Sequence, residues 1–325
     1  MRVKVLLTGG AGFIAERLAF RLTNDQYAVH IVDNLMRGKK DTRIGNLEAS
    51  YNVRFYEKDL LQSTALDNLG SDYEFVIHFA AIVGVENVIK QPYRTLRDNV
   101  LMQEAVIRFA FRQPNLRRML FASTSEVYAG SLVQLNLPFP TPENTPLALP
   151  DLSEPRTSYM LSKIYGEAML LHSGLPYTIV RPHNIYGPRM GMAHVIPQLL
   201  QKAHNAEPNG TLEVASVDHK RCFCYIDDAV EMLVRLLNAD EATREVLNVG
   251  AEAPEVTIRE LSELVIGTVG KPLSIVPRPP THGSPSRRLP DMTRTKKITG
   301  YSAQTSLQDG LRSTYEWYKL QEFSS

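Results

Sequence analysis

The chain has 325 residues and carries 36 Lys and Arg against 35 Asp and Glu, which gives a formal net charge of +1. This length fits one large α/β domain, or one domain with a smaller lobe. The balanced charge argues against a polyanion-binding surface, so we expect no nucleic-acid partner. No apolar run has membrane-spanning length, and we expect a cytoplasmic protein with no membrane partner.

Short apolar runs alternate with helical patterns along the first half of the chain. They predict strands at 4–7, 28–32, 53–56, 75–79, 118–121 and 178–180. They predict helices at 11–23, 64–69, 94–111 and 158–173. The strands read as continuous Val, Ile, Leu and Phe, which is typical of a parallel sheet covered by helices on both faces. We therefore predict an α/β fold with a doubly wound parallel sheet.

The composition changes after Pro182, where Pro, Gly and His become frequent. Helices are predicted at 195–204, 227–238, 258–269 and 307–320, and a long Pro-containing loop at 131–157. We expect residues 1–182 to form the main domain, joined by later elements at about 221–250. Residues 183–325 would form mainly a smaller C-terminal lobe.

The two cysteines, Cys222 and Cys224, are too few for a disulfide framework or a four-ligand zinc site. The eight histidines are scattered and show no metal-ligand spacing. The sequence therefore implies no bound metal.

A glycine-rich turn follows the first predicted strand. Gly9 and Gly12 permit a tight turn in which backbone N–H groups can approach a pyrophosphate closely. The N-terminus of the next helix would then face the negative charge of that pyrophosphate. Asp33 ends the second predicted strand, where an acid accepts hydrogen bonds from an adenosine ribose. This combination predicts a Rossmann-like dinucleotide site. The acid favours NAD over NADP, although three basic residues follow within positions 37–40.

Tyr159 and Lys163 are four residues apart on a predicted helix, so their side chains share one face. A free phenol is a weak base at neutral pH because its pKa is about 10. A nearby ammonium group favours the phenolate. Tyr159 is therefore a candidate acid and base for an alcohol–ketone interconversion with NAD.

The stretch FASTSEVYAG at 121–130 places Ser123, Thr124, Ser125 and Glu126 at the end of a buried strand. Buried polar groups require partners, and ligands bind at the carboxyl ends of strands in such sheets. We therefore predict that this stretch forms the floor of a ligand site.

Several motifs occur in a fixed order along nearly the whole chain: TGGAGFIAERL, DNLMRG, KDL, HFAA, STSEVY, SYMLSK, RPHNIYGP and RCFCYIDD. In this order they resemble the extended short-chain dehydrogenase/reductases. More narrowly, the chain is similar to the NAD-dependent nucleotide-sugar epimerase/dehydratase family. The resemblance implies a Rossmann-like NAD-binding domain at 1–182 and a nucleotide-sugar-binding C-terminal lobe at 183–325.

The resemblance also implies roles for individual positions. The residues expected to bind NAD are Gly9, Gly12, Phe13, Ile14, Asp33, Asn34, Asp59, Leu60, Phe79, Ala80, Ala81, Asn99, Ser123, Tyr159, Lys163 and Pro182. The residues expected to bind a nucleotide-diphosphate sugar are Val85, Thr124, Ser125, Glu126, Asn184, Val195, Arg221 and Arg288. The expected catalytic residues are Thr124, Glu126, Tyr159 and Lys163. By the same resemblance, the helices predicted at 94–111 and 158–173 would pair into the four-helix bundle of a homodimer.

The chemistry implied by the resemblance is oxidation at sugar C4 by NAD⁺, which gives a 4-keto sugar, followed by return of the hydride. A 4-epimerase needs no further acid or base, a 4,6-dehydratase removes H5 and eliminates at C6, and a uronate decarboxylase loses CO₂. Glu126 favours chemistry at C5 or a uronate site. Ser125 replaces the acid of the usual dehydratase, whereas the helix motif SYMLSKI looks like that of the epimerases.

The leading interpretation at this point is a UDP-sugar 4-epimerase that acts on a hexose or hexuronate. The alternative is a dehydratase or a UDP-glucuronate decarboxylase-like enzyme that uses Glu126. A non-catalytic dinucleotide-binding module is a more remote alternative. The intact set of Thr124, Tyr159 and Lys163 argues against it.

Overall fold

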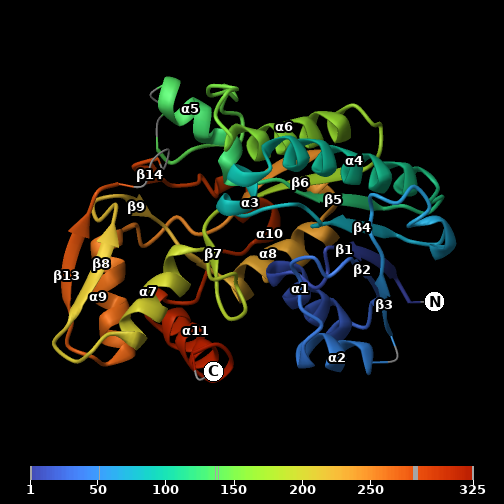
Figure 1. Cartoon of the computed structure of the whole chain (residues 1–325). Coiled ribbons are helices and arrows are strands. Elements are labelled where there is room, and N and C mark those ends of the chain that lie inside the picture. The colour runs from blue at the N-terminus through green and yellow to red at the C-terminus, as the bar shows by residue number, and fades with distance from the viewer. Residues whose placement is uncertain (1, 51, 136, 138, 281–284, 324–325) are drawn as a thin grey trace.

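The computed structural model describes residues 2–50, 52–135, 137, 139–280 and 285–323. In the described part, a parallel seven-stranded sheet has the strand order β11-β6-β5-β4-β1-β2-β3 (Figure 1). Its strands are β1 (Lys4–Thr8), β2 (Ala28–Asp33), β3 (Val53–Glu57), β4 (Phe75–His78), β5 (Arg118–Ala122), β6 (Tyr177–Pro182) and β11 (Glu245–Val249). The predicted α/β fold is therefore confirmed. No helix in the described ranges is long and apolar enough to cross a membrane.

Both faces of the sheet are buried, and successive residues of a strand point into different cores. On β1, Val5 and Leu7 belong to one core, whereas Leu6 belongs to the other. This two-sided burial explains the continuous apolar strands. The first core is covered by α1 (Phe13–Asn24), α2 (Thr42–Glu48), α8 (Ile226–Asn238) and α10 (Thr293–Thr299). The second is covered by α4 (Pro92–Phe111) and α6 (Thr157–Leu171), which lie side by side in Figure 1.

A few predicted elements differ from the structure. The helix expected at 64–69 is only a short 3₁₀ turn, Asp67–Leu69, because Asn68 leaves helical geometry and Gly70 has a φ of +86°. The long loop expected at 131–157 begins with helix α5 (Ala129–Gln134). Several short elements were not predicted separately because they carry too little periodicity; they include α2, α3 (Val85–Lys90), α10 and the edge strand β11.

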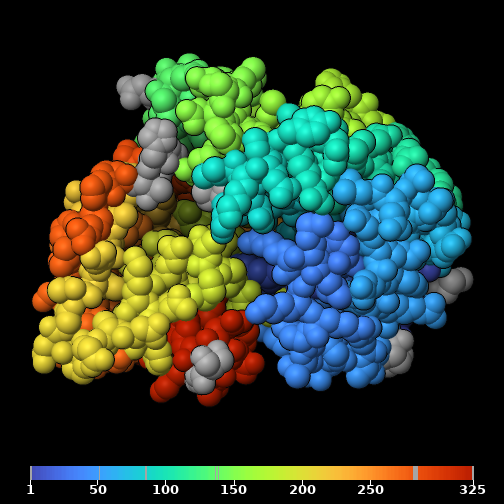
Figure 2. All heavy atoms as spheres, in the orientation of Figure 1, coloured from blue at the N-terminus to red at the C-terminus, as the bar shows by residue number. Residues whose placement is uncertain are grey.

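A third core lies in the C-terminal part of the chain. It is built by α7 (Val195–Asn205), β8 (Thr211–Ala215), α9 (Ile258–Val269), β13 (Ser274–Arg278) and α11 (Leu307–Gln321). Short strands form two further small sheets apart from the seven-stranded sheet: β7 (Ile185–Tyr186) with β10 (Cys224–Tyr225), and β9 (Lys220–Arg221) with β12 (Val256–Thr257) and β14 (Arg287–Arg288). The surface is hollowed between the cyan part near α3 and α4 and the yellow part of this lobe (Figure 2).

Candidate active site

The glycine turn after β1 is closed by backbone contacts that leave no space for side chains. Gly9 has a φ of +71°, and a Cβ there would lie 2.5 Å from the Ala80 nitrogen. The Gly12 amide donates to the Gly9 carbonyl oxygen at 3.0 Å, and Gly12 is the N-cap of α1. The turn therefore presents the N-terminus of α1 at the carboxyl edge of the sheet, which is an arrangement that suits a pyrophosphate. Phe13 and Ile14 form the first turn of α1.

Asp33 ends β2 and connects that strand to the glycine turn. One carboxylate oxygen accepts a hydrogen bond from the Ala11 amide at 3.0 Å, and the other accepts from the Leu35 amide at 2.8 Å. Burial raises the pKa of this carboxyl above its ordinary value, although these two amides counteract the effect. Asn34 accepts a hydrogen bond from the Met36 amide at 3.1 Å, so the loop after β2 is internally ordered.

The other predicted NAD residues lie in loops at the same edge of the sheet or on its covering helices. Asp59 and Leu60 follow β3, Phe79, Ala80 and Ala81 follow β4, and Pro182 ends β6. Asn99 on α4 is buried and accepts from the Ile82 amide at 2.7 Å, while its amide nitrogen donates to the Ser162 hydroxyl at 3.1 Å. Asn99 thereby fixes the loop after β4 to both α4 and α6.

Tyr159 and Lys163 lie on the face of α6 toward the end of β5. The Lys163 ammonium donates to the Ala122 carbonyl oxygen at 2.7 Å and lies 5.9 Å from the centroid of the Tyr159 ring. Burial lowers the pKa of Lys163 to about 7. Burial, together with the Glu126 charge, raises the pKa of Tyr159 above its ordinary value, and a hydrogen bond with Thr124 and the charge of Arg37 offset this only in part. The structure therefore brings Thr124, Tyr159 and Lys163 together.

Ser123 has a buried partner within the protein. Its hydroxyl donates to the Glu167 carboxylate at 2.5 Å, and Glu167 also accepts two hydrogen bonds from Arg181, at 2.9 and 2.7 Å. Ser123 is therefore tied to a buried ion pair, while its cofactor role stays a prediction. Its neighbour Ser125 is 7% exposed and lies in the 3₁₀ turn that follows β5.

Glu126 forms an ion pair with Arg288, at 2.8 Å between a carboxylate oxygen and a guanidinium nitrogen. Burial acts to raise the pKa of Glu126, but the combined effect of Arg288, Arg156 and Arg221 lowers it below the ordinary value. Glu126 is therefore an ionised carboxylate in cationic surroundings. Its charge also acts on Tyr159, which places it beside the Tyr159–Lys163 pair.

The predicted substrate residues of the C-terminal lobe fall into two groups. Arg221 and Arg288 are register partners on β9 and β14, so the strand pairing places them side by side. Asn184, with a φ of +42°, donates to the Cys222 carbonyl oxygen at 3.0 Å, and Val195 packs against the core of the lobe. Val85 begins α3, but its side chain lies outside the described part of the structure.

The sequence patterns alone did not indicate some residues around the site. Arg156 acts on Glu126 from the residue before α6, and Arg189 contacts the glycine turn from the C-terminal lobe. Glu167 could have been found, because it continues the four-residue spacing of Tyr159 and Lys163 along α6. The arginines gave no such signal, because their partners are distant in sequence.

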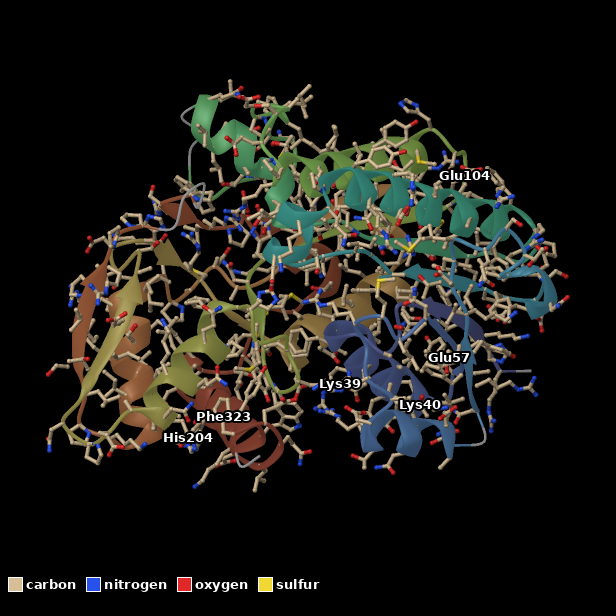
Figure 3. All side chains as sticks on the ribbon, viewed as in Figure 1. Lys39, Lys40, Glu57, Glu104, His204 and Phe323 are labelled. Carbon is tan, nitrogen blue, oxygen red and sulfur yellow. The ribbon has the colours of Figure 1, made fainter. Side chains whose placement is uncertain are left out.

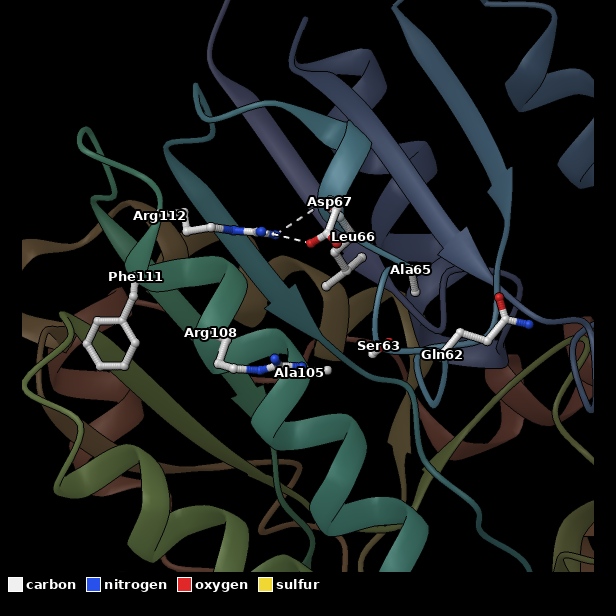
Figure 4. A pocket seen from close by; sticks show the side chains of 9 residues that line it. All are labelled: Gln62, Ser63, Ala65, Leu66, Asp67, Ala105, Arg108, Phe111 and Arg112. Carbon is white, nitrogen blue, oxygen red and sulfur yellow. Dashed lines mark hydrogen bonds and ion pairs between the residues drawn. The ribbon is translucent and has the colours of Figure 1, made fainter.

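A separate cavity of about 330 Å³ lies beside the C-terminal half of α4 (Figure 4). Its walls include Gln62, Ala65 and Arg108, and an ion pair of 2.8 Å between Asp67 and Arg112 closes one side. None of the residues predicted to bind cofactor or substrate lines this cavity.

Comparison with known proteins places this arrangement in a family. Residues 5–250 match the model of the NAD dependent epimerase/dehydratase family. The chain is 30% identical over 331 residues to a UDP-N-acetyl-alpha-D-glucosaminuronate decarboxylase from Bacillus cytotoxicus, and the match covers 98% of each chain. It is 28% identical over 330 residues to UDP-glucuronic acid decarboxylase 1 from Danio rerio, covering 98% of this chain and 73% of the relative.

Two solved structures share the fold over almost their whole length. One is a variant of UDP-glucuronic acid 4-epimerase from Bacillus cereus in complex with UDP-4-deoxy-4-fluoro-glucuronic acid and NAD. It has a TM-score of 0.83 and 26% identity, covering 98% of this chain and 99% of that chain. The other is UDP-glucose 4-epimerase from Thermotoga maritima, with a TM-score of 0.83, 27% identity and the same coverage.

The chain therefore belongs to the NAD-dependent epimerase/dehydratase family, which confirms the resemblance of its motifs. Its cofactor is NAD, and the residues at the carboxyl edge of the sheet fit that cofactor. The Ala80 backbone leaves no room for a Cβ at Gly9, so only glycine allows the tight turn whose helix N-terminus would face a pyrophosphate. Asp33 places a carboxylate at the end of β2, where an acid would accept hydrogen bonds from the adenosine ribose.

Proposed function

We propose that this enzyme acts on a UDP-hexuronate, oxidises the sugar at C4 and releases the C5 carboxylate as CO₂. The observation that carries this proposal is the ion pair between Glu126 and Arg288 at 2.8 Å, beside Tyr159. Three guanidinium groups, on Arg156, Arg221 and Arg288, act on the single carboxylate of Glu126. These four side chains carry net positive charge, which suits a substrate with both a diphosphate and a carboxylate.

The first step is oxidation of the C4 hydroxyl. Tyr159 accepts the hydroxyl proton, and the Thr124 hydroxyl holds the same oxygen by a hydrogen bond. NAD, when bound, supplies the acceptor for the hydride that leaves C4. Lys163 stabilises the Tyr159 phenolate through its positive charge, which its position one helical turn further along α6 allows.

The second step is loss of CO₂ from the 4-keto uronate, which is a β-keto acid. The C5–C6 bond breaks, its electron pair moves into the C4 carbonyl to form an enolate, and a solvent proton is then added at C5. The ionised Glu126 repels the carboxylate that leaves, and this repulsion disappears when neutral CO₂ forms. Arg288 orients that carboxylate and is itself fixed by Glu126. The hydride returns to C4, so no net oxidation occurs.

Dehydration fits these residues less well. Elimination at C6 needs an acid to protonate the leaving hydroxyl, in addition to a base at C5. Arginine neighbours lower the pKa of Glu126, so this side chain is a poor proton donor at neutral pH. The neighbouring residue is Ser125, whose hydroxyl is a far weaker acid than a carboxyl. The Glu126–Arg288 pair thus favours the uronate reaction over elimination.

A second candidate is 4-epimerisation of the same uronate. Thr124, Tyr159 and Lys163 suffice for it, and the Bacillus cereus structure of similar fold is a UDP-glucuronic acid 4-epimerase. Both candidates share the uronate substrate and the 4-keto sugar, and they differ in whether the C5–C6 bond breaks. The experiment that separates them is product analysis by NMR after incubation with UDP-glucuronate and UDP-N-acetylglucosaminuronate. A pentose product supports decarboxylation, and a C4-inverted uronate supports epimerisation.

We also propose a homodimer through α4 and α6. Large apolar side chains are exposed on these neighbouring helices, including Leu101 at 49%, Tyr165 at 53% and Leu171 at 43%. Two adjacent helices that both expose large apolar side chains would bury them against a second copy of the chain. Sedimentation should give about twice the chain mass, and Leu101→Glu combined with Tyr165→Glu should give a monomer. A wild-type monomer at micromolar concentration would exclude this interface.

A further inference from the structure

Arg189 connects the C-terminal lobe to the cofactor half of the molecule through three hydrogen bonds. Its Nε donates to the Asp41 carboxylate at 2.6 Å, one Nη donates to the Ala11 carbonyl oxygen at 3.0 Å, and the other donates to the Lys39 carbonyl oxygen at 2.8 Å. The side chain is only 7% exposed. A planar guanidinium group can donate hydrogen bonds to three separate acceptors at once. The ammonium group of a lysine at this position cannot reach all three together.

The acceptors of Arg189 lie in the two loops that build the NAD site. Ala11 is the residue between Gly10 and Gly12, and its amide donates to Asp33. The Ala11 residue is therefore held on one side by Asp33 and on the other by Arg189. Asp41, in turn, caps α2 by accepting hydrogen bonds from the Arg43 and Ile44 amides, both at 3.2 Å.

The backbone around Arg189 is held in place for this contact. Arg189 has a φ of +72°, which is uncommon for a residue with a side chain. The next residue, Met190, accepts a hydrogen bond from the hydroxyl of buried Tyr318 on α11. Near the end of α11, Glu322 forms an ion pair with Lys39 at 3.0 Å. Figure 3 shows Lys39 on the side of the cofactor half that faces the lobe bearing Phe323.

We infer that Arg189 is a positioning residue for NAD, which fixes the glycine turn and the loop after β2 from the C-terminal lobe. Arg189 acts on NAD indirectly, through Ala11 and Asp41. NAD affinity consequently depends on the packing of the C-terminal lobe. The proposal concerns the cofactor alone and does not depend on the sugar on which the enzyme acts.

The test is the dissociation constant of NAD for the full chain after bound nucleotide has been removed, measured by calorimetry without sugar substrate. The variants are Arg189→Lys, Arg189→Ala and Asp41→Asn. Asp41→Asn keeps an oxygen to cap α2 but loses the charge. The matched control is Arg278→Ala, because Arg278 forms an exposed ion pair with Glu213 within the C-terminal lobe.

We expect both Arg189 variants to bind NAD at least about tenfold more weakly, which corresponds to the loss of one charge-assisted hydrogen bond. Asp41→Asn should shift affinity in the same direction, and the control should stay within twofold. The melting temperature without NAD should fall, because hydrogen bonds of a buried guanidinium are lost, and the increase in melting temperature on adding NAD should also shrink. Arg189→Lys and Asp41→Asn provide the test if Arg189→Ala fails to fold. A folded Arg189→Lys variant with wild-type NAD affinity would overturn the proposal, as would equal destabilisation with and without NAD.

Discussion

A carboxylate oxygen of Glu126 lies 2.8 Å from a guanidinium nitrogen of Arg288, at the point where the C-terminal lobe meets the end of β5. The side chain of Glu126 is 31% exposed and that of Arg288 is 12% exposed, so the pair is partly shielded from water yet accessible to a ligand. The surrounding arginines lower the pKa of Glu126 and keep it ionised at neutral pH. In the proposed reaction, this pair supplies the charge that acts on the C5 carboxylate.

Glu126→Gln tests whether this charge takes part in the reaction. The amide keeps the size of the side chain but removes the negative charge and leaves Arg288 without its ion-pair partner. We expect turnover of a UDP-hexuronate to fall by about 10² or more, in the range of a lost acid, base or charged group. Steady-state kinetics with an NMR assay would measure this, and NAD affinity should stay unchanged.

Glu213→Gln is the matched control for this prediction, because Glu213 forms an exposed ion pair with Arg278 within the C-terminal lobe. It should keep full activity. Wild-type turnover in Glu126→Gln would show that the carboxylate has only a structural role.

Tyr159→Phe should reduce turnover by about 10³ or more, because it removes the only phenol beside Lys163 and Thr124 among the described residues. The ring is retained, so packing on α6 and NAD binding should persist. Turnover measured together with NAD titration separates the two effects. Activity within tenfold of the wild type would contradict the role of Tyr159 as acid and base.

Lys163 should make the stability of the NAD-free protein depend on pH. Its pKa is about 7 in the folded chain because of burial, against an ordinary value of 10.5. Between these values the unfolded chain binds more protons, so the free energy of unfolding should increase with pH by up to about 1.4 kcal/mol per unit. Below pH 7, Lys163 is protonated in both the folded and the unfolded chain. Its contribution to the free energy of unfolding is then constant and at its least favourable value.

The measurement is urea denaturation of the wild type and Lys163→Met from pH 6.5 to 9.5. The difference in unfolding free energy between the two proteins should move in favour of the wild type as the pH increases. A difference that does not change across this range would show that Lys163 titrates normally.

Glu167→Gln should destabilise the protein by about 3–5 kcal/mol, the typical cost of breaking a buried ion pair by removing one charge. Glu167 is 3% exposed, and its carboxylate accepts two hydrogen bonds from Arg181 and one from Ser123. Chemical denaturation measures the change. Glu104→Gln on the neighbouring helix α4 is the control, because Glu104 lies 3.8 Å from Arg108 on the surface. A loss of less than about 1 kcal/mol in Glu167→Gln would contradict this prediction.

The sequence predicted the local parts of this site because their signals are local. The glycine turn, Asp33 and the Tyr159–Lys163 spacing each follow from strand and helix periodicity, and the structure brings them to one edge of the sheet. The six predicted strands are present for the same reason. The seventh strand, β11, was not predicted separately because its five residues lie between two short elements without a clear period.

Strand and helix periodicity could not predict the contacts between the two halves of the chain. Arg288 and Glu126 meet because β14 pairs with β9 in the C-terminal lobe, and no short-range pattern encodes that pairing. The same applies to Arg189 and Asp41, which lie in different lobes. The proposed reaction rests on such long-range contacts, so the sequence patterns left the reaction open between epimerase, dehydratase and decarboxylase.

The most direct test of the proposed reaction is NMR of the products formed from UDP-glucuronate labelled with ¹³C at C6, in D₂O with NAD present. Our account predicts that the label appears as ¹³CO₂ and bicarbonate, and that the sugar product lacks C6 and carries one deuterium at C5. A product that keeps labelled C6 and shows no deuterium at C5, with only C4 inverted, would contradict decarboxylation and identify the enzyme as a 4-epimerase.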